Sequence, residues 1–480
     1  MSFLSLLFAA FFLILVVLYR IAARLGERAA LAQKVILLAA SLVFYAFADL
    51  RFIPFLAYAI AISYFAGIFC KNKIALTAFV LADLAPLLAV KYVPQAANVR
   101  WIFPLGISFF TFQSVGYIAD VYKKKIQAER NFLNIALFVS FFPTISSGPI
   151  QRAGNLIPQL NKAHNFDYDD ATDGLRLFAW GLFKKLCIAD RIALYVNYVY
   201  GNVGDQYGLA LLFATILYSF QIYCDFSGYS DMAIGVARYL GFDVGKNFDR
   251  PYLSQSVGEF WRRWHISLSS WLRDYVYIPL GGSRVALPRI YLNLMATFLV
   301  SGIWHGSTWN FVIWGALHGV FLCAERATKG ARDRMKIPSW INVAVTFCLV
   351  AFAWIFFRAK NVSEAAVVVK KIAAAPTEIL AFINMAKLDG LKDALHKMLS
   401  LTDETGGGVK NMVVNIAILA AFLAVQIATK EKNGQLLIKK QKRIIRWTAY
   451  ILLSAIISFH LFYNYTYQEK ANTEFLYFKF

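Results

Sequence analysis

The dominant pattern along this chain is a series of apolar stretches separated by short polar segments. A helix of about 20 apolar residues crosses the ~30 Å hydrocarbon core of a bilayer, and most of these stretches approach that length. The pattern predicts an all-α, polytopic membrane protein with spans at 3–19, 35–49, 52–70, 74–92, 101–121, 131–148, 171–187, 208–224, 290–306, 308–326, 340–357, 411–429 and 446–464. Whether a further stretch at 188–202 also crosses the membrane stays open, because it is short and contains Arg191.

Three polar stretches interrupt the alternation, at 149–170, 225–289 and 358–410. The second is rich in Gly, Asp and Arg but also in Trp and Tyr. Polar backbone at membrane depth persists only where protein or a water-filled cavity surrounds it. We therefore expect re-entrant or interfacial helices over 251–285, packed into a single membrane domain that covers 1–480. The stretch 358–410 is expected to be a polar insertion into that domain.

Composition excludes a soluble globular domain. Hydrophobic residues make up 59% of the 480 residues, charged residues only 16%, and the mean hydropathy is +0.53. A soluble protein has no place for so much apolar surface, so the lipid bilayer is the expected surrounding. The five cysteines are scattered without a CxxC pair, which argues against a disulfide framework and against a metal site.

The net charge of +21 indicates topology rather than nucleic-acid binding, because the basic residues fall in short runs between apolar stretches. Such runs tend to stay on the cytoplasmic side of the membrane. This places the N-terminus outside the cytoplasm. It also makes 358–410 extracytoplasmic, because a single span separates that insertion from one of the basic runs. The runs are 71–73, 123–130, 329–336 and 430–446.

His305 is the first candidate for chemistry. It follows Trp304 at the end of an apolar stretch and lies between Gly302 and Gly306, which allow close approach of another backbone or a substrate. A neutral imidazole can take a proton from a hydroxyl at pH 7, as acyl transfer to an alcohol requires. The alternative is a core histidine that hydrogen-bonds a neighbouring helix.

His265 is the second candidate, within the segment 259–275. If the segment forms one helix, Trp261, Trp264 and His265 lie on an aromatic face and the arginines lie on the other face. An interfacial helix held by its arginines explains this pattern, but it leaves the histidine among the tryptophans unexplained. His318 lies mid-span and is interpreted either as packing or as tunnel lining.

Asp225, Ser227 and Asp231 lie where the apolar stretch 208–224 ends. The favoured interpretation is that the carboxylates form ion pairs with Arg238 or with the Arg262 and Arg263 pair. A carboxylate dyad for glycoside hydrolysis is an alternative that no other segment supports.

These segments together resemble the membrane-bound O-acyltransferase family, in particular its alginate O-acetyltransferase branch. The likeness extends over most of 1–358 and the last span. Each motif alone is weak, and the set is specific. The motifs are Pro104–Gln113, Phe141–Pro143 with Gly148–Ile150, Asp225–Gly235, Phe260–Arg284, Gly302–Gly306 and Phe475–Phe480.

The resemblance implies a ring of tilted helices around a central tunnel. It also implies that His305 is the catalytic histidine and that His265 occupies the family's second site. Residues expected to bind substrate or donor, or to line the tunnel, are Trp304, His318, Asp225, Ser227, Arg262, Arg263, Trp264 and Arg273.

The expected function is O-acetylation of a cell-surface polysaccharide or peptidoglycan, with acetyl-CoA as the cytoplasmic donor and no bound cofactor. Because the chain has no GxSxG or GDS-type nucleophile segment, the resemblance implies either an extracytoplasmic partner acetyltransferase of the SGNH type or direct transfer to the polymer. Two alternatives stay open. One is a D-alanyl transferase served by an acyl carrier protein, and the other is a transporter with a histidine proton relay.

Overall fold

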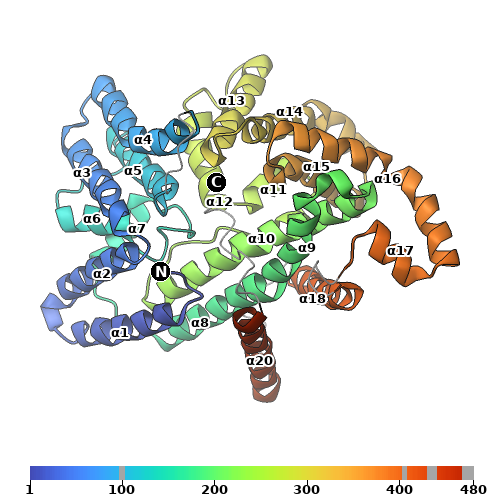
Figure 1. The fold of residues 1–480 in the computed structure, drawn as a ribbon. Coiled ribbons are helices and arrows are strands. Elements are labelled where there is room, and N and C mark those ends of the chain that lie inside the picture. Colours follow the sequence, from blue (N-terminus) through green and yellow to red (C-terminus); the bar gives the residue numbers. More distant parts are fainter. Residues whose placement is uncertain (97–102, 403–407, 430–440, 468–480) are drawn as a thin grey trace. The chain divides into compact units, whose positions relative to one another are not determined.

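The computed structural model describes residues 1–96, 103–402, 408–429 and 441–467, and every regular element in these ranges is helical (Figure 1). Seven of the described helices are long and apolar enough to cross a membrane, among them Gly208–Tyr239 and Ser339–Arg358. The prediction of an all-α, multi-pass membrane protein is therefore confirmed. The C-terminal motif Phe475–Phe480 lies outside the described residues, and the central tunnel stays a prediction.

The described residues form two compact units. The first comprises Met1–Gly181, Tyr229–Asn247 and His265–Val276. Within it, α1 packs on α2, α2 on α6, and α5 on both α3 and α4. Its helices are α1 (Leu6–Ala22), α2 (Ala29–Ala46), α3 (Ile53–Phe69), α4 (Lys73–Ala96), α5 (Ile107–Tyr122), α6 (Phe132–Ser140), α7 (Ala153–Leu160), most of α8 (Tyr168–Phe183), the last part of α10 (Gly208–Tyr239), and α12 (Ile266–Leu272).

The predicted span 131–148 is wrong, because the helix there is short. α6 begins where the Asn131 side chain accepts a hydrogen bond from the Leu133 amide at 2.9 Å, and it ends at Ser140. Pro143 follows closely. It has no amide hydrogen, and it disfavours helical geometry in the residue before it. The Phe142 amide instead donates to Ser41 Oγ on α2 at 3.1 Å, so the chain is satisfied without continuing the helix.

The second unit comprises Leu182–Gly228, Phe248–Trp264 and the described residues of 277–480. It begins with a π-helical turn, Lys184–Ala189. Its other helices are α9 (Asp190–Gly201), the first part of α10, α11 (Val257–Arg263), α13 (Leu287–His305), α14 (Trp309–Met335), α15 (Ser339–Arg358), α16 (Val362–Leu388), α17 (Leu391–Met398), α18 (Gly408–Ala428) and α20 (Arg443–Tyr467).

Two expectations for the polar stretches need revision. α10 continues through the start of 225–289 as far as Tyr239, and the segment 259–275 is not one helix. α11 ends at Arg263 and α12 begins at Ile266, with His265 in the left-handed region at φ 42°. The insertion 358–410 contains α16 and α17. Its extracytoplasmic side and the single-domain organisation stay predictions.

α13 and α14 pack against each other (Figure 1), and two glycines lie at their closest approach. A Cβ on Gly302 would collide with the carbonyl oxygen of Phe311, and one on Gly315 would collide with that of Phe298. Only glycine allows backbones to approach so closely. This crossing fixes the C-terminal end of α13, where His305 lies.

Gly315→Ala is therefore expected to lower the thermal midpoint of the purified protein by several degrees and to reduce its yield, because α13 and α14 must separate or the fold must strain. Gly330→Ala on the same helix is the matched control, since a Cβ there meets no atom within 4 Å. Thermal unfolding in detergent measures both variants. Equal midpoints for the two would contradict the close-packing account.

Candidate active site

His305 is held in one tautomer at the end of α13. Its side chain is 4% exposed, and Nδ1 lies 2.7 Å from the backbone oxygen of Ser301. A carbonyl oxygen only accepts hydrogen bonds, so Nδ1 carries the proton and Nε2 carries the lone pair. Trp304 and Trp314 lie with ring centroids 4.8 and 4.7 Å from the imidazole. The arrangement provides a neutral base in an aromatic enclosure.

A stripe of buried polar residues leads along α13 to His305. Its members recur every four residues and therefore share one helix face. Each is at most 6% exposed, in a helix that is otherwise largely apolar. Intramembrane polar groups are costly and tend to mark functional sites. The stripe is visible in the sequence as a polar residue at every fourth position, but it was not among the predicted site features; its members are Asn293, Thr297, Ser301 and His305.

His318 on α14 has the opposite tautomer. Trp261 Nε1, which can only donate, lies 3.2 Å from His318 Nδ1. Nδ1 therefore accepts, and the proton is on Nε2. This buried histidine anchors α11 to α14 and presents a donor rather than a base. Trp314 thus lies between His305 and the predicted tunnel residue His318, while Trp304, also predicted to line the tunnel, contacts His305 on its own helix.

His265 lies in the first unit, fully buried, and Asn247 determines its orientation. The oxygen Oδ1 of Asn247 lies 3.1 Å from His265 Nδ1 and accepts from both the amide and the hydroxyl of Ser267, at 3.2 and 2.9 Å. The Ser267 amide can only donate, so this atom of Asn247 is the oxygen. His265 Nδ1 therefore carries the proton, and the lone pair is on Nε2, as in His305. The positive φ of a non-glycine residue costs about 1–2 kcal/mol, and such strain gathers at functional sites.

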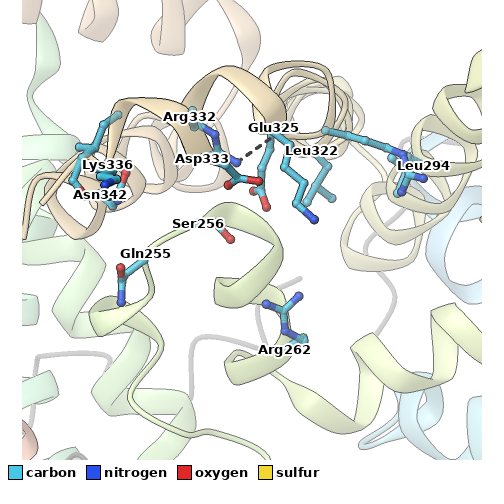
Figure 2. A pocket seen from close by; sticks show the side chains of 13 residues that line it. Gln255, Ser256, Arg262, Leu294, Leu322, Glu325, Arg332, Asp333, Lys336 and Asn342 are labelled. Carbon is cyan, nitrogen blue, oxygen red and sulfur yellow. Dashed lines mark hydrogen bonds between the residues drawn. The ribbon is translucent and has the colours of Figure 1, made fainter. Parts of the chain in front are cut away.

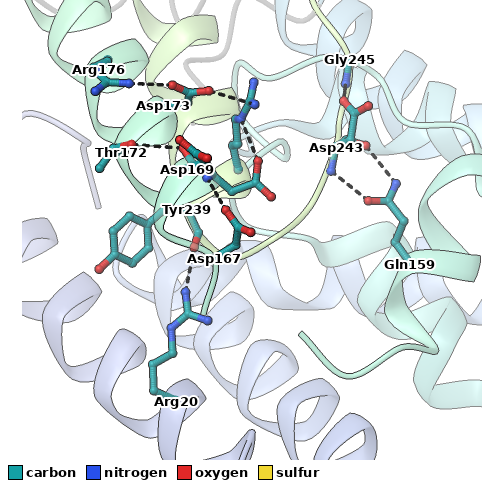
Figure 3. Close-up of polar contacts among 12 residues, drawn as sticks. Arg20, Gln159, Asp167, Asp169, Thr172, Asp173, Arg176, Tyr239, Asp243 and Gly245 are labelled. Carbon is teal, nitrogen blue, oxygen red and sulfur yellow. Dashed lines mark hydrogen bonds and ion pairs between the residues drawn. The ribbon is translucent and has the colours of Figure 1, made fainter. Parts of the chain in front are cut away.

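The loop that carries Asn247 is fixed by polar contacts within the same unit (Figure 3). Gln159 on α7 accepts from the Asp243 amide at 2.8 Å and donates to the Asp243 carbonyl at 2.9 Å. The Asp243 carboxylate accepts from the Gly245 amide at 2.9 Å. Gln151 donates to the carbonyl of Val244 at 3.1 Å. These contacts hold the loop backbone on both sides of residues 243–245 and so position Asn247 beside His265.

We expect Asn247→Ala to lower the turnover of acetyl transfer about tenfold and to shift its pH profile, because His265 loses the acceptor that fixes its proton on Nδ1. Asn155→Ala is the matched control, since the Asn155 amide also binds the 240–247 loop, through the Asp243 carbonyl at 3.2 Å, but does not touch His265. Turnover and pH profile are measured on purified protein. A similar effect of both substitutions would assign Asn247 a merely structural role.

Asp225 and Ser227 pair with lysines that the sequence analysis did not single out. Lys185 Nζ lies 2.6 Å from Asp225 Oδ1 and 2.7 Å from Asp190 Oδ1, and Lys184 Nζ donates to Ser227 Oγ at 2.9 Å. All five side chains are buried. Lys184 and Lys185 belong to the π-helical turn, and such turns are frequent at functional sites.

The predicted pairing of Asp225 with Arg238 or with the Arg262 and Arg263 pair is therefore wrong. Arg238 pairs instead with Asp170 and Asp173 on α8, at 3.3 and 3.1 Å. Asp173 also pairs with Arg176 at 2.8 Å (Figure 3). Arg238 lies in the part of α10 that belongs to the first unit and Asp225 in the part that belongs to the second.

The predicted donor-binding arginines differ in their surroundings. Arg263 forms an ion pair with Glu259 at 2.6 Å, and Arg273 pairs with Asp274 at 2.9 Å. Arg262 instead lines a cavity of about 670 Å³ in the second unit (Figure 2). Trp264 is buried in that unit, with its ring centroid 5.2 Å from that of Trp354.

The second unit thus contains His305, Trp304, His318, Asp225, Ser227, Arg262, Arg263 and Trp264, whereas His265 and Arg273 belong to the first. Among the residues that the structure describes, no three His, Cys, Asp or Glu side chains gather where they could hold a metal ion.

Comparison with known families identifies one match. The model of the membrane-bound O-acyltransferase family matches residues 121–363. This range covers both motif histidines, α13 and the buried lysine network.

Individual relatives agree with the family match. A probable alginate O-acetylase of Pseudomonas aeruginosa is 42% identical over 61% of this chain and 55% of its own length. A peptidoglycan O-acetyltransferase of Helicobacter pylori is 36% identical over 70% of this chain and 73% of its own length. A teichoic acid D-alanyltransferase of Bacillus subtilis is 30% identical over 58% of this chain and 77% of its own length. The chain spans just over half the length of the first of these relatives.

Proposed function

Since this chain belongs to the membrane-bound O-acyltransferase family, we propose that it transfers an acetyl group from acetyl-CoA for the O-acetylation of a cell-surface polysaccharide or peptidoglycan. The names of the alginate and peptidoglycan relatives support the acetyl group and the class of acceptor. The bacterial inner membrane is the proposed location. An extracytoplasmic SGNH-type acetyltransferase is the proposed partner that receives the acetyl group.

The observation that carries the proposal is the tautomer of His305. Nδ1 is committed to the Ser301 carbonyl at 2.7 Å, which leaves Nε2 as the base. Nε2 takes the proton of the acceptor hydroxyl while the hydroxyl oxygen attacks the thioester carbonyl carbon. The carbon–sulfur bond then breaks, and the protonated imidazole returns its proton to the leaving thiolate. An ester and free coenzyme A are the products.

His265 is proposed as the second histidine of the reaction. Its proton is held on Nδ1 by Asn247 in the same way, with 3.1 Å between the two atoms. An amide in its place could keep a hydrogen bond but could not take up a proton. His265→Asn should therefore retain more acetyl-transfer activity than His265→Ala. Equal, complete loss of that activity in both variants would instead assign His265 an obligatory proton transfer.

D-alanyl transfer is the second candidate, favoured by the relative from Bacillus subtilis. It has the same thioester chemistry but a carrier-protein donor. A transporter with a histidine relay has no comparable support, since none of these relatives is named a transporter.

A donor competition assay tests the proposal. Purified protein is supplied with radiolabelled acetyl-CoA or with D-alanyl carrier protein, each with a short polysaccharide acceptor and the candidate partner acetyltransferase. We expect label from acetyl-CoA to enter the acceptor as an alkali-labile ester. Label from the D-alanyl carrier alone would replace the proposal by the second candidate, and label from neither would overturn both.

A further inference from the structure

The cavity beside Arg262 has a strongly basic lining. Its walls come from α11, α13, α14 and the start of α15, all in the second unit (Figure 2). Five of its side chains are cationic and two are anionic. The full lining is Gln255, Ser256, Arg262, Leu294, Leu322, Glu325, Arg326, Lys329, Arg332, Asp333, Lys336, Ile337 and Asn342.

One of the two acidic side chains is already engaged by the protein. Glu325 Oε2 accepts a hydrogen bond from the Gly258 amide at 2.9 Å. Gly258 has no Cβ, and one built there would lie 3.0 Å from the Glu325 carboxylate. This carboxylate therefore fixes α11 against α14. The lining has three more cationic than acidic side chains, and this excess favours an anionic ligand.

Guanidinium and ammonium groups that converge on a cavity favour phosphate as the ligand group. Arginine binds phosphate oxygens with paired, charge-assisted hydrogen bonds, and lysine adds a point charge. Figure 2 shows Arg332 and Lys336 on the α14 wall of the cavity and Arg262 on the facing α11 wall. A volume of about 670 Å³ suits a headgroup-sized molecule, since ligand pockets measure roughly 300–1,000 Å³.

The place of the cavity along α14 indicates where the phosphate comes from. α14 is apolar over its first turns and becomes strongly basic near its C-terminal end, around Arg326 and Lys336. Next to this end lie the exposed side chains of Met335, at 61%, and Trp340, at 72%. Exposed tryptophan next to basic residues marks the boundary between the hydrocarbon core and the headgroups. We therefore expect the cavity to lie at headgroup depth.

The apolar part of the lining is aliphatic, not aromatic. Leu294, Leu322 and Ile337 contribute it, and none of the described lining residues offers an aromatic face on which a nucleotide base could stack. Aliphatic side chains suit a glycerol backbone and acyl chains instead. Of the three arginines predicted to bind the donor, only Arg262 belongs to the described lining of this cavity.

We propose that this cavity is a binding site for the phosphate group of an anionic phospholipid, such as phosphatidylglycerol. Basic pockets between membrane helices on the cytoplasmic side bind such headgroups, and the basic run 329–336 is expected on that side. The proposal does not depend on the acyl-transfer reaction, because lipid binding is measured without any substrate.

The test is a lipid titration of the full-length purified protein in detergent, followed by native mass spectrometry. Phosphatidylglycerol is compared with phosphatidylcholine, and inorganic phosphate and coenzyme A serve as competitors. We expect phosphatidylglycerol to bind at least about tenfold more tightly than phosphatidylcholine, and neither soluble competitor to displace it at millimolar concentration. Equal affinity for the two lipids would overturn the proposal. Displacement by either soluble competitor would assign the cavity to a soluble phosphate compound and would also overturn it.

Paired charge removals locate the site. Arg326→Gln with Lys329→Gln removes two lining cations, and the affinity for phosphatidylglycerol should fall about 25-fold, at about fivefold per charge. Arg289→Gln with Arg334→Gln removes the same charge from exposed positions outside the lining. That control should change the affinity less than about threefold. An equal loss in both double variants would show general charge attraction and would contradict a defined site.

Discussion

His305→Ala is expected to reduce acetyl transfer at least about a hundredfold, because general-base catalysis contributes roughly 10²–10⁴-fold. The protein should still insert and remain monodisperse, since the hydrogen bond that is lost, from Nδ1 to the Ser301 carbonyl at 2.7 Å, lies within one helix. Consumption of acetyl-CoA by the purified variant measures the effect. Retention of more than about a tenth of wild-type turnover, a loss of only ~1.4 kcal/mol, would rule out the general-base role.

His460→Ala is the matched control for this experiment. His460 lies on α20 and makes the same kind of contact, from Nδ1 to the Ile456 carbonyl at 2.9 Å. It is also buried, at 8% exposure, and has no proposed role in acyl transfer. Its removal should leave turnover within about twofold of the wild type. A comparable loss at both positions would indicate that the His305 effect is structural.

Lys185→Ala is expected to lower the free energy of unfolding more than Gly315→Ala or any of the histidine substitutions. It leaves the carboxylates of Asp190 and Asp225, at 2.7 and 2.6 Å from the lysine, buried near each other without their shared cation. Breaking a buried ion pair from one side costs about 3–5 kcal/mol. The thermal midpoint in detergent should fall sharply, or the variant should fail to accumulate as a folded protein.

Arg51→Ala provides the contrast for Lys185→Ala. It also removes a cation paired at 2.6 Å, but its side chain is 70% exposed, and a surface ion pair contributes about 0–1 kcal/mol. Its thermal midpoint should stay close to that of the wild type. If the two variants unfolded at the same temperature, the claim that the buried ion pairs of Lys185 stabilise the fold would be wrong.

The sequence predicts the helices well because most of them depend on local apolar length. α3 (Ile53–Phe69) and α15 (Ser339–Arg358) lie within one residue of the expected spans. The errors occur where a few residues override the apolar run. Pro143 ends the span expected at 131–148, and α10 continues past Cys224 because Asp225 is neutralised by Lys185 and need not leave the helix.

The candidate site is predictable in its residues but not in its geometry. His305 is found from its flanking glycines and its motif, whereas its tautomer depends on a carbonyl four residues earlier. The break at His265 depends on Asn247, which is 18 positions away in the sequence. Lys184 and Lys185 lie inside the expected span 171–187, but their partners Ser227, Asp190 and Asp225 lie beyond it, so nothing within that span indicates how the two lysines are paired. Long-range partners of this kind leave no local pattern.

The most direct test of the central claim is the sidedness of the acetyl donor. The orientation of the protein in proteoliposomes is determined by impermeant maleimide labelling of single cysteines, which replace Lys124 or Lys387 in a cysteine-free background. Charge predicts that these two positions lie on opposite faces, with Lys124 cytoplasmic. Labelled acetyl-CoA is then supplied to one face, and the acceptor with its partner acetyltransferase to the other. We predict ester formation only when acetyl-CoA is on the Lys124 face. Ester formation only with donor on the Lys387 face, or labelling of both cysteines from the same side, would contradict the account.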